Sequence, residues 1–362
     1  MPIARIAGTV NGADDPNRAL RARLLYHLFA GGWDLYNSNG DQRITLSNIE
    51  RKIIESEAFV FTPGATLEDL FKAVSVFVGY QTLDKNLRGK GTVILNSDAT
   101  WNPFFRLLDH LHDLGTIRQE FRDYLLAVET PEEVLPTLDR VRMAGLPDAS
   151  HGHEIAPNGP ALSRTESFET PPPSNLEGNV CVFCSASIKD PAYLIDGREL
   201  GRQLAAHRLG CVSGAGNSGI MGEVVAGAVE AGGWTAGSNV PHIIELEGLP
   251  AGLSSFWLRP DIYTRMEVMI EKSDAFVIFP GGAGTVQEML ALLIFQAQQH
   301  PIMADKPIVV FNRIDAQGRH FWSPLLELLA GMGAPSPFAV VESFSDILPA
   351  LREGLARRPL AA

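Results

Sequence analysis

The segment from Pro280 to Glu288, Pro-Gly-Gly-Ala-Gly-Thr-Val-Gln-Glu, carries the residues best suited to chemistry in this chain. A buried strand is expected to run into the Pro-Gly-Gly turn, and a helix is expected to begin with Thr285 as its N-cap. Flexible amides and a hydroxyl at a helix N-terminus form a cradle for an oxyanion such as a monophosphate. The expected phosphate ligands are Gly281, Gly282, Gly284 and Thr285.

Glu288 has two interpretations in this pattern. Thr-x-x-Glu is also the pattern of a capping box, in which Glu288 would only close the first turn of the helix. An acid at the third helical position also faces the same pocket mouth as the phosphate cradle, so one residue can serve both purposes. The sequence leaves the structural cap and the catalytic acid equally open.

Arg265 lies in a second segment of interest, 260–269, on the element that precedes the cradle strand. Asp261 is expected to cap a helix there. An arginine on a first helical turn is usually a solvated or salt-bridged surface residue, so Arg265 becomes a functional candidate only together with the cradle. The apolar positions expected to point inward from this helix are Met266, Met269 and Ile270.

A third motif, Gly214-Ala215-Gly216-Asn217-Ser218-Gly219, follows an expected strand and opens an expected helix. Its glycines permit positive φ and close backbone approach, and the helix start offers free N–H groups. The same motif also describes a tight strand-to-helix turn without a ligand. A dinucleotide site would need an acid at the end of the next strand. The strand expected over 234–240 ends without one, which counts against NAD.

Alternating strand-like and helix-like segments surround these motifs. Short apolar runs are expected to form strands, with amphipathic helices between them, among them 196–207 with Leu200 and Leu204 one turn apart. This alternation predicts an α/β fold with a doubly wound parallel sheet and helices on both faces. The expected strands are 179–184, 210–213, 234–240, 255–258, 275–279 and 307–311.

The first half of the chain repeats the second half in reduced form. Residues 56–64 (SEAFVFTPG) resemble residues 273–281 (SDAFVIFPG), and the segments that follow match in order and spacing. We infer tandem Rossmann-like α/β units, the first copy shortened by roughly one strand–helix unit and degenerate. The predicted domains are 1–144 and 178–362, joined by a linker at 145–177 that is rich in Pro, Ser and Gly.

The first copy departs from the motif where chemistry would occur. Opposite 280–288 it has Pro-Gly-Ala-Thr-Leu-Glu-Asp at 63–69, aligned as a turn two residues shorter with Asp69 in the place of Glu288. Asn48 stands in the place of Arg265. A contracted turn has fewer amides to offer, so the first copy is expected to be catalytically silent.

Composition limits the classes of function. The 362 residues include 42 acidic and 30 basic side chains, a formal net charge of -12, without any basic run. Binding to nucleic acid or to an anionic membrane is therefore not expected. No uncharged apolar run approaches the ~20 residues of a membrane span, and the N-terminal residues lack the layout of a secretory signal. We expect a soluble cytoplasmic protein.

The cysteines and histidines do not form a recognisable metal site. Cys181-x-x-Cys184 resembles a redox or metal pair, but it lies on an expected buried strand without a second pair, which favours structural burial. We expect no metal. The histidines considered, none with a ligand partner at suitable spacing, are His151, His153, His207 and His242.

Together these residues resemble the LOG family of nucleoside 5'-monophosphate phosphoribohydrolases, long labelled as lysine decarboxylases. Arg265 followed by 280–288 matches the family signature Arg…PGGxGTxxE position by position. The segments 182–187 and 214–222 look like the family's two earlier loops, and the resemblance spans about residues 178–352. A pyridoxal decarboxylase would need a Schiff-base lysine beside a phosphate cup, and no lysine lies inside these loops.

The resemblance implies hydrolysis of the N-glycosidic bond of a nucleoside 5'-monophosphate, such as AMP or a cytokinin ribotide, without a cofactor. Residues 260–262 with Arg265 and Glu267 look more like bacterial purine/pyrimidine nucleotide nucleosidases. The plant cytokinin-activating type usually carries Lys where this chain has Met266. Family members are dimers or larger assemblies, which implies a homodimer or a pseudo-dimer of the two copies.

Roles follow from the resemblance and from glycosidase chemistry. Glu288 is expected to stabilise the positive charge that develops on the sugar and to orient or deprotonate the attacking water. Arg265 is expected to bind phosphate or sugar oxygens and to hold Glu288 ionised through a charge-assisted hydrogen bond. The residues expected on the nucleoside side are Gly214, Gly216 and Ser185.

Two alternative functions are compatible with the same motifs. One is a non-catalytic nucleotide or molybdenum-cofactor carrier of the same fold, and the other is a nucleotide-sensing regulator whose first half binds an effector. Retention of both Arg265 and Glu288 favours the enzyme, because a carrier needs the cradle but not the acid.

Overall fold

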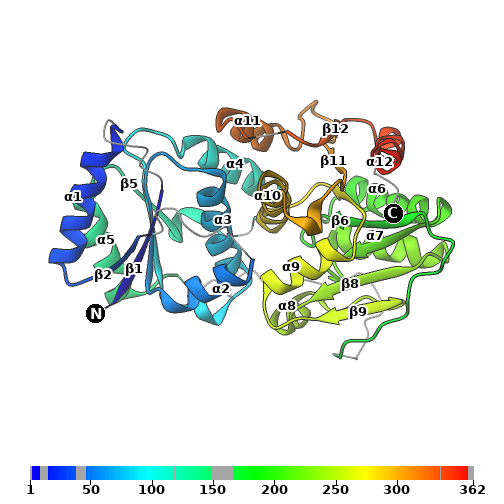
Figure 1. The fold of residues 1–362 in the computed structure, drawn as a ribbon, viewed down its shortest axis with the longest axis horizontal. Coiled ribbons are helices and arrows are strands. Elements are labelled where there is room, and N and C mark those ends of the chain that lie inside the picture. Colours follow the sequence, from blue (N-terminus) through cyan, green and yellow to red (C-terminus); the bar gives the residue numbers. More distant parts are fainter. Residues whose placement is uncertain are drawn as a thin grey trace. The chain divides into compact units, whose positions relative to one another are not determined.

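The computed structural model describes residues 2–8, 15–37, 46–117, 119–147, 166–334 and 336–357. The chain divides into two compact units, residues 1–152 with 327–334 and residues 153–326 with 335–362. Each copy of the repeat builds one parallel sheet flanked by helices, so the predicted tandem α/β architecture is confirmed (Figure 1). Most of the predicted linker, 148–165, lies outside the described residues, and the exact domain boundaries stay a prediction.

The first sheet has five parallel strands in the order β2-β1-β3-β4-β5. The strands are β1 (Ile3–Ala7), β2 (Asp34–Asn37), β3 (Ala58–Phe61), β4 (Gly91–Leu95) and β5 (Leu125–Val128). The helices are α1 (Asn17–Ala30), α2 (Leu46–Glu55), α3 (Leu67–Gln81), η1 (Lys85–Leu87), α4 (Asn102–Asp113), η2 (Phe121–Asp123) and α5 (Pro131–Ala144).

One face of this sheet packs against two helices. Every second residue of β1, β3 and β4 points to the same side, where α1 and α5 lie next to each other. The helices α2, α3 and α4 lie on the other side (Figure 1). The buried residues of this core include Ala4, Ile6, Leu24, Leu28, Ala58, Val60, Val93, Leu95, Val134 and Leu138.

The second sheet has seven parallel strands in the order β12-β11-β10-β6-β7-β8-β9. They are β6 (Gly178–Phe183), β7 (Leu209–Ser213), β8 (Thr235–Asn239), β9 (Ser255–Leu258), β10 (Ala275–Ile278), β11 (Ile308–Phe311) and β12 (Ala339–Val341). The helices are α6 (Pro191–Ala206), α7 (Gly219–Glu230), α8 (Pro241–Glu247), α9 (Ile262–Glu271), α10 (Ala283–Ala297), η3 (Pro301–Met303), α11 (Ser323–Gly331), η4 (Phe344–Asp346) and α12 (Ile347–Ala356).

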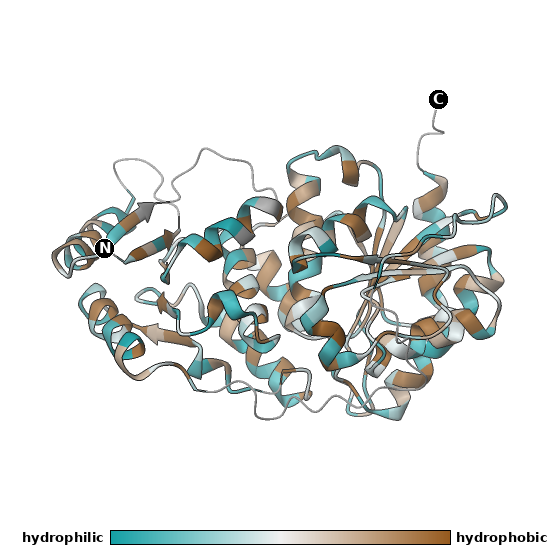
Figure 2. Cartoon of the chain, turned by 90° about the horizontal axis from the view of Figure 1, so that it is seen from below, coloured by the Kyte–Doolittle hydropathy of each residue, from teal (hydrophilic) through white to brown (hydrophobic). Residues whose placement is uncertain are grey.

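All six strands predicted for this half are present, but one predicted helix begins earlier than expected. The helix predicted over 196–207 is α6, which begins at Pro191 because Asp190 caps it by accepting a hydrogen bond from the Ala192 N–H. Hydrophobic residues concentrate in the strands and on the helix faces toward them (Figure 2).

The two sheets match strand for strand, with β2-β1-β3-β4-β5 corresponding to β7-β6-β10-β11-β12. Two equivalent lysines show how closely the copies agree. Lys90 donates to the carbonyls of Ile53 and Ile54 near the end of α2. Lys306 donates to the carbonyls at the equivalent positions, the last two residues of α9. Within the described residues the first copy has no counterpart of β8, β9 or the helices beside them. Two strand–helix units therefore lack a described counterpart, where roughly one was predicted.

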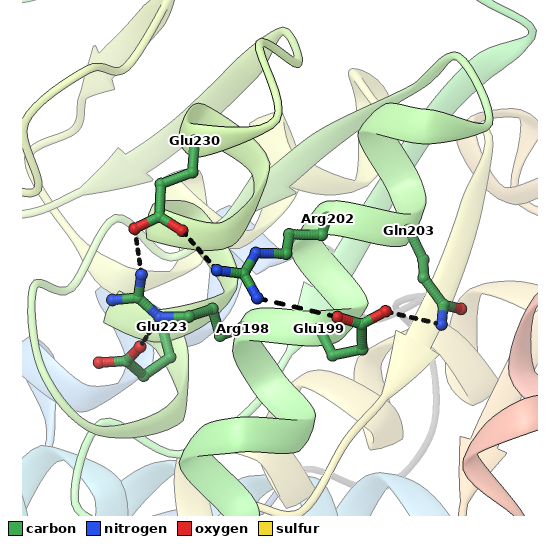
Figure 3. Close-up of polar contacts among 6 residues, drawn as sticks. All are labelled: Arg198, Glu199, Arg202, Gln203, Glu223 and Glu230. Carbon is green, nitrogen blue, oxygen red and sulfur yellow. Dashed lines mark hydrogen bonds and ion pairs between the residues drawn. The ribbon is translucent and has the colours of Figure 1, made fainter.

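Helices α6 and α7 lie in close contact because three glycines face the contact. A Cβ on Gly201 would lie 2.0 Å from the Val224 carbonyl oxygen, and one on Gly227 would lie 1.9 Å from the Arg198 carbonyl oxygen. Exposed and half-buried ion pairs link residues of α6 and α7 (Figure 3), and exposed pairs of this kind individually stabilise little. Their members are Arg198, Glu199, Arg202, Glu223 and Glu230.

The end of the predicted linker is paired to the edge of the second sheet. Phe168 and Phe256 exchange two backbone hydrogen bonds of 3.0 and 2.7 Å in an antiparallel bridge to β9, and Thr170 N–H donates to Ser254 O at 3.2 Å. The Phe168 ring joins the cluster beneath β9. The chain therefore covers one edge of its own sheet with an extended segment.

The three cysteines are free and buried, as expected for Cys181 and Cys184. Burial raises the pKa of both thiols well above the ordinary value, which keeps them protonated and unreactive. Within the described ranges no group of three His, Cys, Asp or Glu residues is placed to hold a metal ion. Among the helices of the described residues, none is long and apolar enough to cross a membrane.

Candidate active site

The turn between β10 and α10 differs from the prediction in where the helix begins. The N-cap of α10 is Gly282, not Thr285, and Thr285 is the third residue of the helix. Glu288 therefore lies one turn further along, so the Thr285–Glu288 capping box does not form. Thr285 folds back over the turn instead: a Cβ on Gly281 would lie 2.1 Å from its Oγ1, which requires glycine there.

The amides of this turn are available to an anion. Among the described residues, the N–H groups of Gly281, Gly282, Ala283 and Gly284 donate to no carbonyl or side chain. The first N–H groups of a helix have no intrahelical acceptor, and they lie at the positive end of the helix dipole. A Cβ placed on Gly284 meets nothing within 4 Å. The turn thus combines unsatisfied donors with open space.

The glycine-rich loop between β7 and α7 is different, because its amides are turned into the protein. The N–H of Ala215 donates to Ser213 Oγ at 3.2 Å, that of Gly216 donates to Met221 Sδ at 3.1 Å, and that of Asn217 donates to Gly248 O at 3.3 Å. This loop is therefore not a second vacant anion cradle. The β10–α10 turn is the stronger candidate for a phosphate.

Arg265 is held in place by one carbonyl of β8 and one of the loop after β7. Asp261 caps α9, as predicted, by accepting hydrogen bonds from the amides of Tyr263 and Thr264. Arg265 Nε donates to Ser238 O at 2.9 Å, and Nη2 donates to Gly214 O at 3.2 Å. A Cβ on Gly214 would lie 1.9 Å from Nη2, so only glycine lets the guanidinium lie against this loop.

The guanidinium reaches Glu288 from this position, with 3.5 Å between Arg265 Nη1 and Glu288 Oε1. Both side chains are nearly buried, 12% and 7% exposed. Burial raises the pKa of Glu288 to about 7, although the charge of Arg265 acts in the opposite direction. Arg265 thus favours the ionised form of Glu288, as expected, but the desolvation of the buried carboxylate is the larger effect.

Glu247, at the end of α8, is a second acid of this site that the sequence analysis missed. A Cβ on Gly216 would lie 2.1 Å from its Oε2, so the carboxylate lies directly against the glycine-rich loop. Its negative charge further raises the pKa of Glu288. No spacing rule marks it, because α8 joins the site from a separate strand–helix unit.

The loop after β6 joins the same edge of the sheet. Ser185 N–H donates to Pro280 O at 3.1 Å, and Ser185 Oγ accepts from the amides of Ser187 and Ile188. Lys189, which sequence reasoning also missed, donates to Ser218 Oγ at 2.8 Å beside the start of α7. The predicted site residues therefore come from the loops after β6, β7 and β10 and from the N-terminal turns of α9 and α10, all beyond the carboxyl ends of the parallel strands, where ligands of such sheets bind.

The first copy has a different turn from the one predicted. Five residues (62–66) separate β3 from α3, whereas four (279–282) separate β10 from α10, so the first turn is longer by one residue. Since α3 and α10 both have 15 residues, Asp69 matches Thr285 and Lys72 matches Glu288. Placing Asp69 opposite Glu288 in a shortened turn was wrong.

A capping box closes the first copy's helix at this point. Thr66 accepts from the Asp69 amide, and Asp69 accepts from the Thr66 amide. Asp69 also forms an ion pair with Lys72 at 3.2 Å. The capping alternative considered for the second copy is therefore realised in the first, with a cation in the place of the acid.

Known proteins resemble the second copy. A family model described as possible lysine decarboxylase matches residues 221–338. The chain is 34% identical over 155 residues to a probable cytokinin riboside 5'-monophosphate phosphoribohydrolase of Oryza sativa subsp. japonica, covering 41% of this chain and 59% of that relative. It is 31% identical over 135 residues to the cytokinin riboside 5'-monophosphate phosphoribohydrolase of Mycobacterium tuberculosis, covering 37% of this chain and 70% of that relative.

Among solved structures, the Moco carrier protein from Chlamydomonas reinhardtii aligns with a TM-score of 0.39 and 19% identity, over 50% of this chain and 98% of that one. The chain spans about three-fifths of the rice relative's length. The region matched by the family model contains Arg265, Glu288 and the turn before α10. From this match and the identity to the mycobacterial relative, the chain belongs to the LOG family.

Proposed function

We propose that the second copy hydrolyses the N-glycosidic bond of nucleoside 5'-monophosphates, releasing the free base and ribose 5-phosphate. The observation that carries the proposal is the Arg265–Glu288 pair, which lies at the same sheet edge as a helix start whose amides have no acceptor among the described residues. The names of the rice and mycobacterial relatives support the same reaction class.

The phosphate is assigned to the β10–α10 turn. Three consecutive N–H groups, those of Gly282, Ala283 and Gly284, lie at the N-terminus of a 15-residue helix. Such a terminus favours a dianionic phosphate by hydrogen bonding and by its dipole. With the 5'-phosphate held there, the ribose extends toward the acid one turn along the helix, and the base toward the loop of Gly214 and Gly216.

Glu288 is assigned the role of activating the attacking water. Departure of the base leaves positive charge on the ribose ring, and water must add to C1' while losing a proton. A carboxylate in a buried site stabilises that charge and accepts the proton, and a pKa of about 7 suits a base working near neutral pH. Arg265 donates hydrogen bonds through Nε and Nη2 to two carbonyls, and its Nη1 forms the ion pair with Glu288. Arg265 therefore positions the acid.

The substrate range within this class is part of the proposal. The printed names of the relatives point to cytokinin ribotides. Met266 in place of the lysine usual in the plant type points to ordinary purine or pyrimidine nucleotides. Both substrate classes carry the same ribose 5-phosphate, so the cradle and the acid serve either one.

The test is to incubate the protein with AMP, GMP, CMP and isopentenyladenosine 5'-monophosphate and to quantify free base and ribose 5-phosphate. At least one substrate should be cleaved, and Glu288→Gln should lower kcat by at least ~100-fold. Glu267→Gln, an exposed acid on α9, is the matched control and should keep the wild-type rate. Nucleotide binding without release of base from any of the four would overturn the proposal in favour of a binding protein.

A further inference from the structure

The strand β5 leaves one edge of the first sheet open. It pairs with β4 alone, and no other described residue pairs with its outer edge. Its sequence, Leu-Leu-Ala-Val, has neither the lysine nor the proline with which proteins commonly protect an edge strand. Leu126 is half-buried and Ala127 is exposed, so this edge is accessible to another strand.

A groove of about 540 Å³ runs beside this edge. Its floor is formed by β5, one wall by α4 with Phe105 and Arg106, and the other by Arg140 of α5. Arg122 of η2 also lines it. The Phe105 ring stacks against Phe121 and supplies an apolar surface. All of these residues belong to the first unit.

The groove has an excess of positive charge within a chain whose net charge is negative. Arg122 is already paired with Asp109 at 2.7 Å and with Glu120 at 3.3 Å. Arg106 and Arg140 are exposed, and in the described part of the chain neither has an ion-pair or hydrogen-bond partner. Two guanidinium groups on opposite walls thus lie available for carboxylates, which they bind in bidentate geometry.

The chain itself shows how such an edge is used. At β9 an extended segment around Phe168 pairs antiparallel with the edge strand through backbone hydrogen bonds. An extended peptide can form hydrogen bonds with the whole row of amides and carbonyls on the outer edge of β5, whereas a compact anion is too small to do so. Pairing of β5 with β5 of a second copy would bring two sets of arginines together, which like-charge repulsion disfavours.

We propose that the groove beside β5 is a docking site for an extended acidic peptide, which adds to the outer edge of β5 and pairs its carboxylates with Arg106 and Arg140. The backbone of the peptide supplies the affinity along β5, and the two arginines select acidic side chains. The site is independent of the nucleotide chemistry proposed for the second copy.

The test measures binding of fluorescein-labelled octapeptides to the full chain by anisotropy. The probe alternates Glu and Val, and its comparison peptides alternate Lys and Val or carry N-methyl groups on alternate amides of the Glu/Val sequence. The Glu/Val peptide should bind at least ~10-fold more tightly than either comparison peptide. It should also slow hydrogen exchange in residues 125–128.

Charge-reversed variants locate the site. Arg106→Glu with Arg140→Glu should weaken binding of the Glu/Val peptide at least ~10-fold. Arg88→Glu with Arg142→Glu changes the net charge equally at exposed positions outside the groove and should change affinity less than twofold. Glu288→Gln should bind the peptide as the wild type does. Equal binding of the N-methylated peptide, or equal effects of the two double variants, would overturn the proposal.

Discussion

Arg265 and Glu288 form an ion pair at 3.5 Å, yet the pKa of Glu288 is raised from its ordinary 4.5 to about 7. Burial of the carboxylate is the larger effect, and the negative charge of Glu247 adds to it. The guanidinium donates hydrogen bonds to the carbonyls of Ser238 and Gly214 and meets this acid as an ion pair. The pair therefore produces an acid poised to gain or lose its proton near neutrality.

The pH dependence of hydrolysis should report the raised pKa of Glu288. If Glu288 works as a base, kcat/KM for AMP should rise with pH through about 7 in the wild type. Glu247→Gln removes a negative charge, which lowers the pKa of Glu288 and should move the rising limb to lower pH. Glu245→Gln, on the exposed side of the same helix, serves as the control and should leave the limb in place. A limb unmoved by Glu247→Gln contradicts the coupling.

Folding stability should change with pH in the opposite direction to kcat/KM, falling as pH rises. Because the pKa of Glu288 is raised in the folded state, the folded protein binds more protons than the unfolded one between pH 4.5 and about 7. The free energy of unfolding should therefore fall as pH rises through this window, by about 3 kcal/mol from this group. Glu288→Gln lacks this titration. Its Tm by calorimetry should exceed the wild-type value at pH 8 and approach it at pH 5, and equal differences at both values would exclude the effect.

Substitutions at two glycines of the cradle should distinguish an effect on phosphate binding from an effect on folding stability. Gly284→Ala places a methyl group in open space on a helix, so the Tm should stay within ~2 °C of the wild type while KM for AMP rises at least ~10-fold. Gly281→Ala forces its Cβ against Thr285 and should lower the Tm. Unchanged KM in a well-folded Gly284→Ala protein would place the phosphate elsewhere.

The first copy should contribute nothing to catalysis through its equivalent positions. Lys72 stands where Glu288 stands in the second copy, and a cation opposes the positive charge of the reaction. Lys72→Gln should therefore leave the rate of base release within about twofold. In a Glu288→Gln background, Asn48→Arg with Lys72→Glu should restore no activity, because the capping box occupies the amides of Thr66 and Asp69 at that helix start. Restored release of base would show that the first copy can be reactivated.

Much of the fold was predictable because it depends on local patterns. The strands, the helix capped by Asp261 and the duplication all follow from apolar periodicity and spacing, which act within a few residues or repeat along the chain. The sequence also indicated the LOG family from Arg265 and 280–288. Local patterns failed at the helix starts: Thr-x-x-Glu predicted a cap at Thr285, but packing of Thr285 over Gly281 moved the cap to Gly282.

By itself, therefore, the amino-acid order determined the two parallel sheets, the glycine turns and the identity of the two charged candidates. The tertiary structure alone decided that Arg265 reaches Glu288, that Glu247 joins them, that the amides before α10 stay without an acceptor among the described residues, and that Lys72 replaces the acid in the first copy. These outcomes depend on how deeply side chains from separate strand–helix units are removed from water and which charges they meet there. Desolvation and charge proximity are properties of packing between distant segments, and no local spacing encodes them.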